Sequence, residues 1–277
     1  MTIKKLKITL ITSLILTLAF GGAVSAIKNG APDEENNWPY VCWVVLWDGV
    51  SQYVYLCSGS AIQSDVVLCA GHCTSIPGIM YSWVSFEPAA SFPPPEVFGV
   101  DSEEWIEVAE RHTHPLFSMG EGKKGITDWI THDVGILVLE EEVELDRYAE
   151  LPGEYLVDTL PMKQDLDIVG YGVQYQVHGG GPPSWDYIDL GYRYYSTAQL
   201  IQSEDVMSDE FMRVTSNPGD GKGGTCYGDS GGPILKAGTD MVLGVCSWGT
   251  NGNCAGVSYE QRVDLPEILS WIEGYLD

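Results

Sequence analysis

Beyond residue 26, the apolar residues of this chain occur in short runs separated by turn-forming residues. Val41–Leu46, Val66–Leu68, Ile136–Leu139 and Met241–Val245 are such runs, and the chain contains 32 glycines and 15 prolines. Runs of this length, bounded by turn residues and rich in Val and Ile, are typical of β-strands. We therefore expect an all-β protein.

The carboxyl terminus departs from this pattern. After Asp264, the residues Ile268, Leu269, Ile272 and Leu276 recur at helical spacing. This periodicity predicts one closing helix over residues 264–277.

The amino terminus has the layout of a secretory signal. Three lysines among the first seven residues precede a mostly apolar run from Ile8 to Phe20, and Val24-Ser25-Ala26 offers small residues for cleavage. We expect residues 1–26 to be removed, so that the mature chain begins at Ile27. An uncleaved membrane anchor is the alternative. Export predicts a secreted protein, extracellular or periplasmic in a Gram-negative bacterium, in a compartment that permits disulfides.

The formal net charge of −25 excludes several classes of partner. Such a charge repels nucleic acid and anionic membranes and favours solubility. No cluster of Cys, His and acidic residues has zinc-site spacing, and the acidic stretch 101–104 lacks a recognisable calcium pattern. We interpret His112, His114 and His132 as structural, and we expect no metal and no cofactor.

The strongest local signal is Gly228-Asp229-Ser230-Gly231-Gly232-Pro233. Glycines around a serine leave room for a substrate backbone and let nearby amides point at one spot. Serine is a weak nucleophile that needs a base and donors for the developing oxyanion. The nucleophile elbow of α/β-hydrolases has the same Gly-x-Ser-x-Gly form, but in that fold the His follows the Ser. All five histidines, at positions 72, 112, 114, 132 and 178, precede Ser230, which excludes that fold.

The base must therefore lie upstream of the serine. His72 ends an apolar run in Cys69-Ala70-Gly71-His72-Cys73, and Asp133 stands at the start of another run, Val134–Leu139. The order His, Asp, Ser is the chymotrypsin order.

These motifs together resemble the trypsin/chymotrypsin family of serine endopeptidases, over nearly all of the chain from residue 27. The resemblance implies two six-stranded antiparallel β-barrels with the active site between them. Residues 27–145 would form the first barrel, with His72 and Asp133, and residues 146–277 the second, with Ser230 and the closing helix. The matching segments are Ile27–Gly30, Trp38–Val41, Cys57–Ile62, Leu68–Cys73, Gly170–Gly172, Gly228–Pro233 and Ser247–Gly249.

The resemblance also implies the catalytic roles. Ser230 would attack the scissile carbonyl, His72 would act as base and then acid, and Asp133 would orient the imidazole. The backbone amides of Gly228 and Ser230 would form the oxyanion hole. A new amino group on Ile27, released by signal cleavage, would pair with Asp229 and shape that hole. The alternative is that cleavage falls elsewhere and Ile27 is an ordinary strand residue.

Seven cysteines leave an odd count. The resemblance pairs Cys57 with Cys73 and Cys226 with Cys254. The other three, Cys42, Cys69 and Cys246, are expected to be free and buried. A Cys69–Cys246 bond is a weaker alternative.

The resemblance places Gly224 at the base of the specificity pocket, with Thr225 beside it. Ser247, Trp248 and Gly249 would pair with an extended substrate, and Gly249 and Gly256 would leave the pocket walls open. Without an Asp at the base, this predicts cleavage after bulky apolar rather than basic residues. Two alternatives remain: Gly224 is a plain loop glycine, or Asp220, Thr225 or Ser258 alters the pocket.

The sequence therefore predicts a secreted, monomeric serine endopeptidase that acts on protein or peptide substrates. The rival interpretation is a catalytically inactive homologue that serves as a secreted binding protein. The presence of all three triad residues favours the enzyme.

Overall fold

A computed structural model describes most of the chain after residue 25. The described residues are 26–51, 54–91, 103–120, 130–173, 176–177, 184–185, 190–203, 208–216, 222–250, 252 and 254–276. The predicted signal cleavage motif (apart from residue 26), Asp101 and Asp220 lie outside them.

The first half of the chain forms a closed barrel in the strand order β2-β3-β4-β7-β6-β5. All but the last residue of β2 are buried, because one side faces the barrel interior and the other packs on neighbouring structure. The strands are β2 (Val41–Trp47), β3 (Val54–Gln63), β4 (Val66–Cys69), β5 (Tyr81–Ser85), β6 (Ile106–Thr113) and β7 (Gly135–Leu139).

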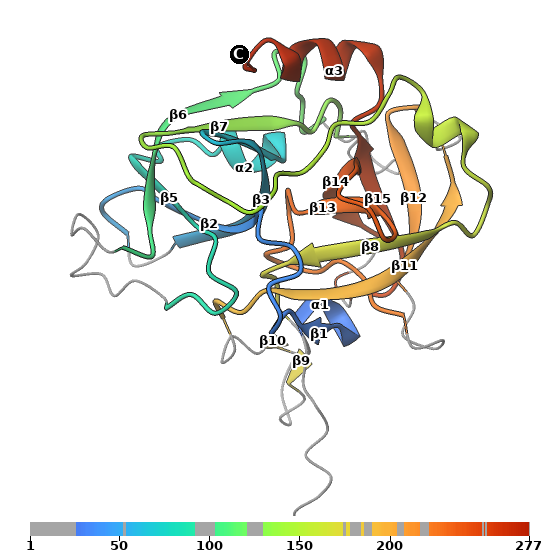
Figure 1. Cartoon of the computed structure of the whole chain (residues 1–277), viewed down its shortest axis with the longest axis horizontal. Coiled ribbons are helices and arrows are strands. Elements are labelled where there is room, and N and C mark those ends of the chain that lie inside the picture. Colours follow the sequence, from blue (N-terminus) through green and yellow to red (C-terminus); the bar gives the residue numbers. More distant parts are fainter. Residues whose placement is uncertain are drawn as a thin grey trace, which may run out of the picture.

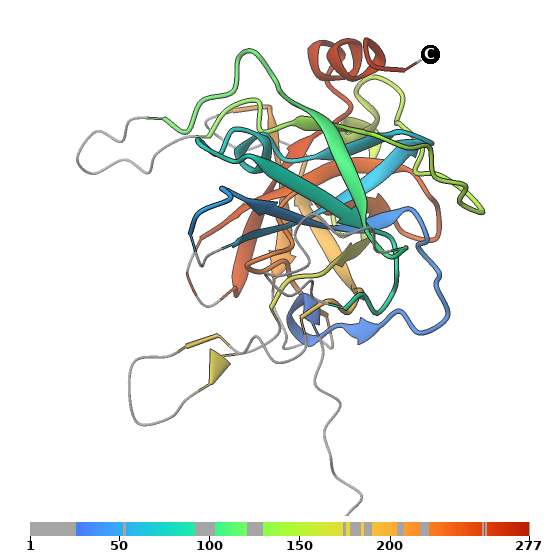
Figure 2. The ribbon, with the colours of Figure 1, turned by 90° about the vertical axis from the view of Figure 1, so that its left-hand side faces the viewer.

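The second half forms a sheet in the order β1-β11-β12-β15-β14-β13-β8, which a further β11–β8 pairing closes into a six-stranded barrel with β1 on its edge. Its strands are β8 (Asp165–Gly170), β11 (Tyr194–Gln202), β12 (Phe211–Ser216), β13 (Pro233–Lys236), β14 (Val242–Gly249) and β15 (Gly256–Arg262). The short strands β9 (Gln176–Val177) and β10 (Ser184–Trp185) pair separately. Figure 1 shows the two barrels side by side, and Figure 2 shows them from the side. The prediction of an all-β protein with two six-stranded antiparallel barrels is confirmed.

The segment at the start of the expected mature chain belongs structurally to the second barrel. Strand β1 (Ala31–Pro32) pairs with β11, and Lys28 forms a bridge with Gly224. Residues 27–32 thus precede the first barrel in sequence but pair with the second. This brings the amino-terminal segment to the predicted base of the specificity pocket.

A buried arginine ties the two barrels together. Arg193, fully buried, forms an ion pair of 2.9 Å with Asp33 and donates to the carbonyl oxygens of Val41 and Phe86 on the first barrel. Tyr171, at the end of β8, adds a bond from its hydroxyl to the carbonyl oxygen of Glu87. These contacts fix how the barrels meet, and therefore the cleft between them.

Helical structure is sparse among the described residues. It comprises single turns at α1 (Ala26–Asn29) and α2 (Gly71–Thr74), a 3-10 turn at Leu156–Thr159, and the closing helix α3 (Pro266–Glu273). Helix α3 lies at the top of the view in Figure 1. Its Trp271 contacts His114, and Tyr275 just beyond it contacts His112 on β6 of the first barrel. Asp264 precedes α3, and its carboxylate binds Arg262. None of the described helices has the length and apolar character needed to cross a membrane.

Two disulfides are present, Cys57–Cys73 and Cys226–Cys254. Cys42, Cys69 and Cys246 are free and buried, so the alternative Cys69–Cys246 bond does not form. Burial raises the pKa of all three free thiols well above the usual range, which keeps them protonated.

Candidate active site

Strand pairing brings His72 and Asp133 together. In the antiparallel pair of β4 and β7, Cys69 lies opposite Gly135. His72 follows Cys69 by three residues and Asp133 precedes Gly135 by two, so both leave the barrel at the same end. The His72 Nδ1 lies 2.8 Å from Asp133 Oδ2, and the His72 backbone N–H donates to Asp133 Oδ1 at 2.7 Å. The carboxylate thus fixes both the ring and the backbone of the histidine.

The second barrel holds Asp133 from the other side. Ser247 Oγ, at the end of β14, donates a hydrogen bond to Asp133 Oδ2. The Asp133 backbone N–H donates to Gln261 Oε1 at 2.8 Å, and Gln261 in β15 is fully buried. Asp133 itself has no exposed surface. A buried carboxylate needs donors such as His72 and Ser247 to remain charged.

The pKa values follow from this geometry. Burial alone would lower the pKa of His72, but the charge of Asp133 and its hydrogen bond outweigh burial and raise it above 6.5. Burial would raise the pKa of Asp133, but His72 and the donors from His72 and Ser247 lower it below 3.8. Asp133 therefore stays ionised, and His72 binds a proton more tightly than a free imidazole does.

Ser230 sits in a loop that rests on the first barrel. The Ser58 backbone N–H on β3 donates to the Ser230 carbonyl at 2.8 Å, and the Gly231 N–H donates to the Cys246 carbonyl at 2.8 Å. Gly228 and Gly231 have φ values of 95° and 82°, and a Cβ on Gly231 would stand 2.5 Å from the Ser58 carbonyl oxygen. Only glycine satisfies this conformation and this close approach. Within the described part of the chain, the N–H groups of Gly228 and Ser230 have no hydrogen-bond partner.

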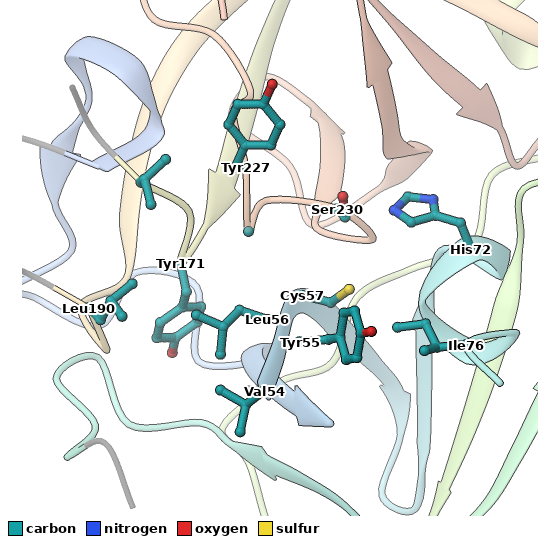
Figure 3. A pocket seen from close by; sticks show the side chains of 12 residues that line it. Val54, Tyr55, Leu56, Cys57, His72, Ile76, Tyr171, Leu190, Tyr227 and Ser230 are labelled. Carbon is teal, nitrogen blue, oxygen red and sulfur yellow. The ribbon is translucent and has the colours of Figure 1, made fainter. Parts of the chain in front are cut away.

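Ser230 and His72 lie next to each other at the rim of one cavity of about 310 Å³ (Figure 3). The disulfide from Cys57 to Cys73 links β3, against which the Ser230 loop rests, to α2, which carries His72. The cavity continues from this pair over apolar side chains that include Tyr55, Ile76 and Leu190. A peptide carbonyl at the rim would meet a hydroxyl, an imidazole and the unused amides of Gly228 and Ser230.

Asp229, beside the serine, is almost fully buried. Its two carboxylate oxygens accept from the N–H groups of Gly172 and Cys226, each at 2.8 Å. Burial, together with the charge of Glu260, raises its pKa to about 7. Ile27 is also fully buried, among core residues of the second barrel. No ion pair reaches Asp229 from the described residues while the chain continues ahead of Ile27.

The predicted pocket residues lie on three neighbouring segments. Gly224 packs on Ser216 and donates to the Lys28 carbonyl at 3.2 Å, with Thr225 following it. Gly249 and Gly256 are exposed at facing ends of β14 and β15. Trp248 stacks on Tyr259 with ring centroids 4.1 Å apart.

The other histidines have structural contacts. His112 Nε2 lies 2.8 Å from Glu110 Oε2, and His114 stacks on His132. Among the described residues, one cluster has ligand atoms close enough for a metal ion: Cys57, His72 and Cys73. The disulfide occupies both sulfurs of that cluster, so it offers a metal only the imidazole.

A protein-family model described as Trypsin matches residues 27–272. The chain belongs to the trypsin family. Serine protease 1 of Drosophila melanogaster is 27% identical over 261 residues, covering 91% of this chain and 83% of that protein. Trypsin II-P29 of Gallus gallus is 26% identical over 282 residues, covering 95% of each.

Solved structures show the same fold. A structure named HL collagenase superposes with a TM-score of 0.67 at 17% identity, covering 89% of this chain and 97% of that one. A mutant of human heparin binding protein superposes with a TM-score of 0.63 at 19% identity, covering 90% and 96%. The resemblance to trypsin-like proteins predicted from the motifs is confirmed, and with it the class of serine-type endopeptidases.

Sequence reasoning missed three features of the site in this trypsin-family chain. It placed Ser247 along the substrate but not on Asp133, and it did not single out Gln261 or Glu260. The sequence did contain a signal for these residues. A strand with one buried face alternates apolar and polar residues, whereas Glu260, Gln261 and Arg262 are three polar residues in a row. All three are buried.

Proposed function

We propose that this chain is an active serine endopeptidase that hydrolyses peptide bonds with Ser230, His72 and Asp133. Ser230 Oγ attacks the scissile carbonyl while His72 Nε2 takes its proton. Asp133 holds Nδ1 and stabilises the imidazolium. His72 then protonates the leaving amine. In the second half, His72 takes a proton from water, the water oxygen attacks the acyl carbon, and His72 returns the proton to Ser230 Oγ as the acid product leaves.

The observation that carries the proposal is the buried Asp133 carboxylate bound to both His72 and Ser247, with Ser230 beside His72 at the cavity rim. A histidine in this setting has its Nδ1 occupied, so the other ring nitrogen is the one left to act as base. The amides of Gly228 and Ser230 supply donors for the oxyanion. Removing one such donor typically costs about 100- to 1,000-fold in rate.

A phosphonate that reacts with activated serines tests the proposal. Chain starting at Ile27 should be labelled once, at Ser230, and Ser230→Ala should not be labelled. His72→Gln should slow labelling by about 1,000-fold or more, because the hydroxyl loses its base. Labelling of wild type no faster than that of His72→Gln would overturn the proposal.

The rival candidate is an inactive binding homologue. One of the similar structures is of a heparin binding protein. Heparin is a polyanion, and the formal charge of −25 on this chain opposes binding a polyanion. This electrostatic repulsion favours an active enzyme over an inactive homologue that binds heparin.

We further propose that the protein is secreted and becomes active when cleavage frees the amino group of Ile27. The two disulfides support an oxidising compartment. Buried Asp229 supports activation, because no cation among the described residues pairs with its carboxylate and the Ile27 segment is already docked on the second barrel beside Gly224.

One extra residue ahead of Ile27 tests this activation step. The extension should lower kcat/KM by about 100-fold or more, since leaving one member of a buried ion pair alone typically costs about 3–5 kcal/mol. Edman or mass-spectrometric confirmation of each amino terminus is the control. Equal activity of the two forms would exclude the Ile27–Asp229 pair as the activating contact.

A further inference from the structure

The cavity beside Ser230 is apolar along most of its length. Ser230 and His72 stand at one side of it (Figure 3). None of the described residues that line its volume of about 310 Å³ is an Asp, Glu, Lys or Arg, although the chain carries 39 acidic residues. The mechanism proposed above uses only the side with Ser230 and leaves the apolar part without a role. That part is lined by Val54, Tyr55, Leu56, Ile76, Tyr171, Val173, Leu190 and Tyr227.

The walls of this cavity are held in place by the fold. The Val173 N–H donates to the Tyr227 carbonyl oxygen at 2.7 Å, which ties one wall to the loop that carries the serine. Val173 also packs with the Cys226–Cys254 disulfide. Tyr171 has 1% exposed surface, and its hydroxyl donates to the Glu87 carbonyl oxygen at 2.8 Å, which fixes its ring. The cavity is therefore preformed, as ligand pockets usually are.

The position of the cavity assigns it to one half of the substrate. The serine loop lies between two strands. The Ser58 N–H of β3 donates to the Ser230 carbonyl at 2.8 Å, and the next amide of the loop donates to the Cys246 carbonyl of β14, also at 2.8 Å. The expected substrate pairing places the acyl half along Ser247–Gly249, at the end of β14. The cavity lies on the other side of the loop, where residues 54–57 of β3 form a wall, so it faces the half that leaves as the amine.

We infer that this cavity binds the side chain of the residue on the amine side of the cleaved bond and selects a large, uncharged apolar one, such as Leu, Met or Phe. The inference rests on the proposed peptidase function and names the substrate class of the same site. A charged side chain would lose its hydration among described walls that offer no counter-charge, which is costly. An apolar side chain would leave water, which favours Leu over Gly by about 10- to 100-fold in binding.

The same cavity should let the acyl-enzyme pass its acyl group to an added amine. The amine nitrogen attacks the acyl carbon and gives a proton to His72. His72 then returns a proton to Ser230 Oγ as the bond between Oγ and the acyl carbon breaks. The product is an amide instead of the acid that water forms. The added amine occupies the place that the leaving amine vacated, so its side chain reports on the cavity alone.

The first test measures this partition between water and amine. An ester with one fixed acyl group is incubated with chain beginning at Ile27 at about pH 8.5, where α-amino groups are mostly neutral. Leucine, glycine or glutamate amide is added, and the amide and acid products are quantified by chromatography. Leucine amide should give an amide-to-acid ratio at least about 10-fold above that of glycine amide, and glutamate amide a ratio no higher than glycine amide. Equal ratios for leucine and glycine amides would overturn the inference.

A charge placed at the cavity tests its location. Tyr55 is 50% exposed and lies beside Ile76 in the cavity wall (Figure 3), so Tyr55→Arg leaves the core intact. It should raise the ratio of glutamate to leucine product at least about 5-fold, because the guanidinium supplies a counter-charge. Tyr155→Arg, at a position 51% exposed and outside the cavity, is the matched control and should keep the wild-type ratio. The same ratio in both variants would contradict the assignment of the cavity.

The ester also separates this inference from the peptidase proposal. Acid product with wild type but not with Ser230→Ala supports the chemistry of Ser230, whichever amine is present. Acid product without selection among the amines would defeat the role of the cavity alone. No acid product from a sample with a confirmed Ile27 terminus would defeat the peptidase proposal and this inference with it.

Discussion

At the residue scale, the proposed catalysis depends on the charge state of His72. The Asp133 carboxylate raises the pKa of His72 above 6.5 although burial opposes the shift. Only the neutral imidazole accepts the Ser230 proton. The kcat/KM should therefore be constant above the His72 pKa and fall about tenfold per pH unit below it, with a midpoint above 6.5. A pH–rate profile on a neutral ester substrate measures this, and activity that stays flat down to about pH 4 would contradict the role of His72.

The same scale shows why Asp133 keeps its charge without contact with solvent. His72 on α2 and Ser247 on β14 donate to the carboxylate, and Gln261 on β15 accepts from the Asp133 backbone N–H, so both barrels hold the residue. Each contact alone is an ordinary hydrogen bond. Their convergence makes the position of the imidazole a consequence of the whole fold.

At the element scale, the Cys57–Cys73 disulfide connects β3 to α2 across 16 residues. In the chain-entropy account, a loop of this length stabilises the fold by about 3 kcal/mol. We expect Cys57→Ala/Cys73→Ala in a Ser230→Ala background to lose about this much unfolding free energy, measured by urea denaturation. Ser230→Ala with both cysteines intact is the reference. An unchanged midpoint and slope would show that barrel packing alone positions α2.

The elements also show what a sequence can predict and what it cannot. The strands were predictable because Val41–Leu46 and Ile136–Leu139 are apolar runs bounded by turns. Motif order predicted that His72, Asp133 and Ser230 would lie together, as they do. The disulfides followed from family resemblance. Glu260 and Gln261 escaped notice because their partners, Thr225 and Asp133, lie 35 and 128 residues away in the chain. Both partners lie on other segments, so these contacts depend on how β15, which pairs with β14, packs in the folded chain.

At the scale of the whole molecule, buried acids make stability depend on pH. Free Glu titrates near 4.5, whereas folded Glu260 holds its proton to about pH 7. Between these values the folded state binds more protons than the unfolded state, so Glu260 makes stability fall as pH rises, by about 1.4 kcal/mol per unit. Relative to Ser230→Ala, the double variant Ser230→Ala/Glu260→Gln should therefore gain unfolding free energy from pH 5 to pH 7. Urea denaturation at pH 5, 6 and 7 measures the difference, and a constant difference would mean that Glu260 is not the buried acid described above.

The central claim, that this trypsin-family chain cleaves peptide bonds with Ser230, is tested most directly by a cleavage-site profile. Wild-type chain beginning at Ile27 and Ser230→Ala are incubated in parallel with a denatured protein mixture, and new termini are read by mass spectrometry. The account predicts new termini with wild type alone. The same termini in both samples, or none with a wild-type sample whose amino terminus is confirmed as Ile27, would contradict it.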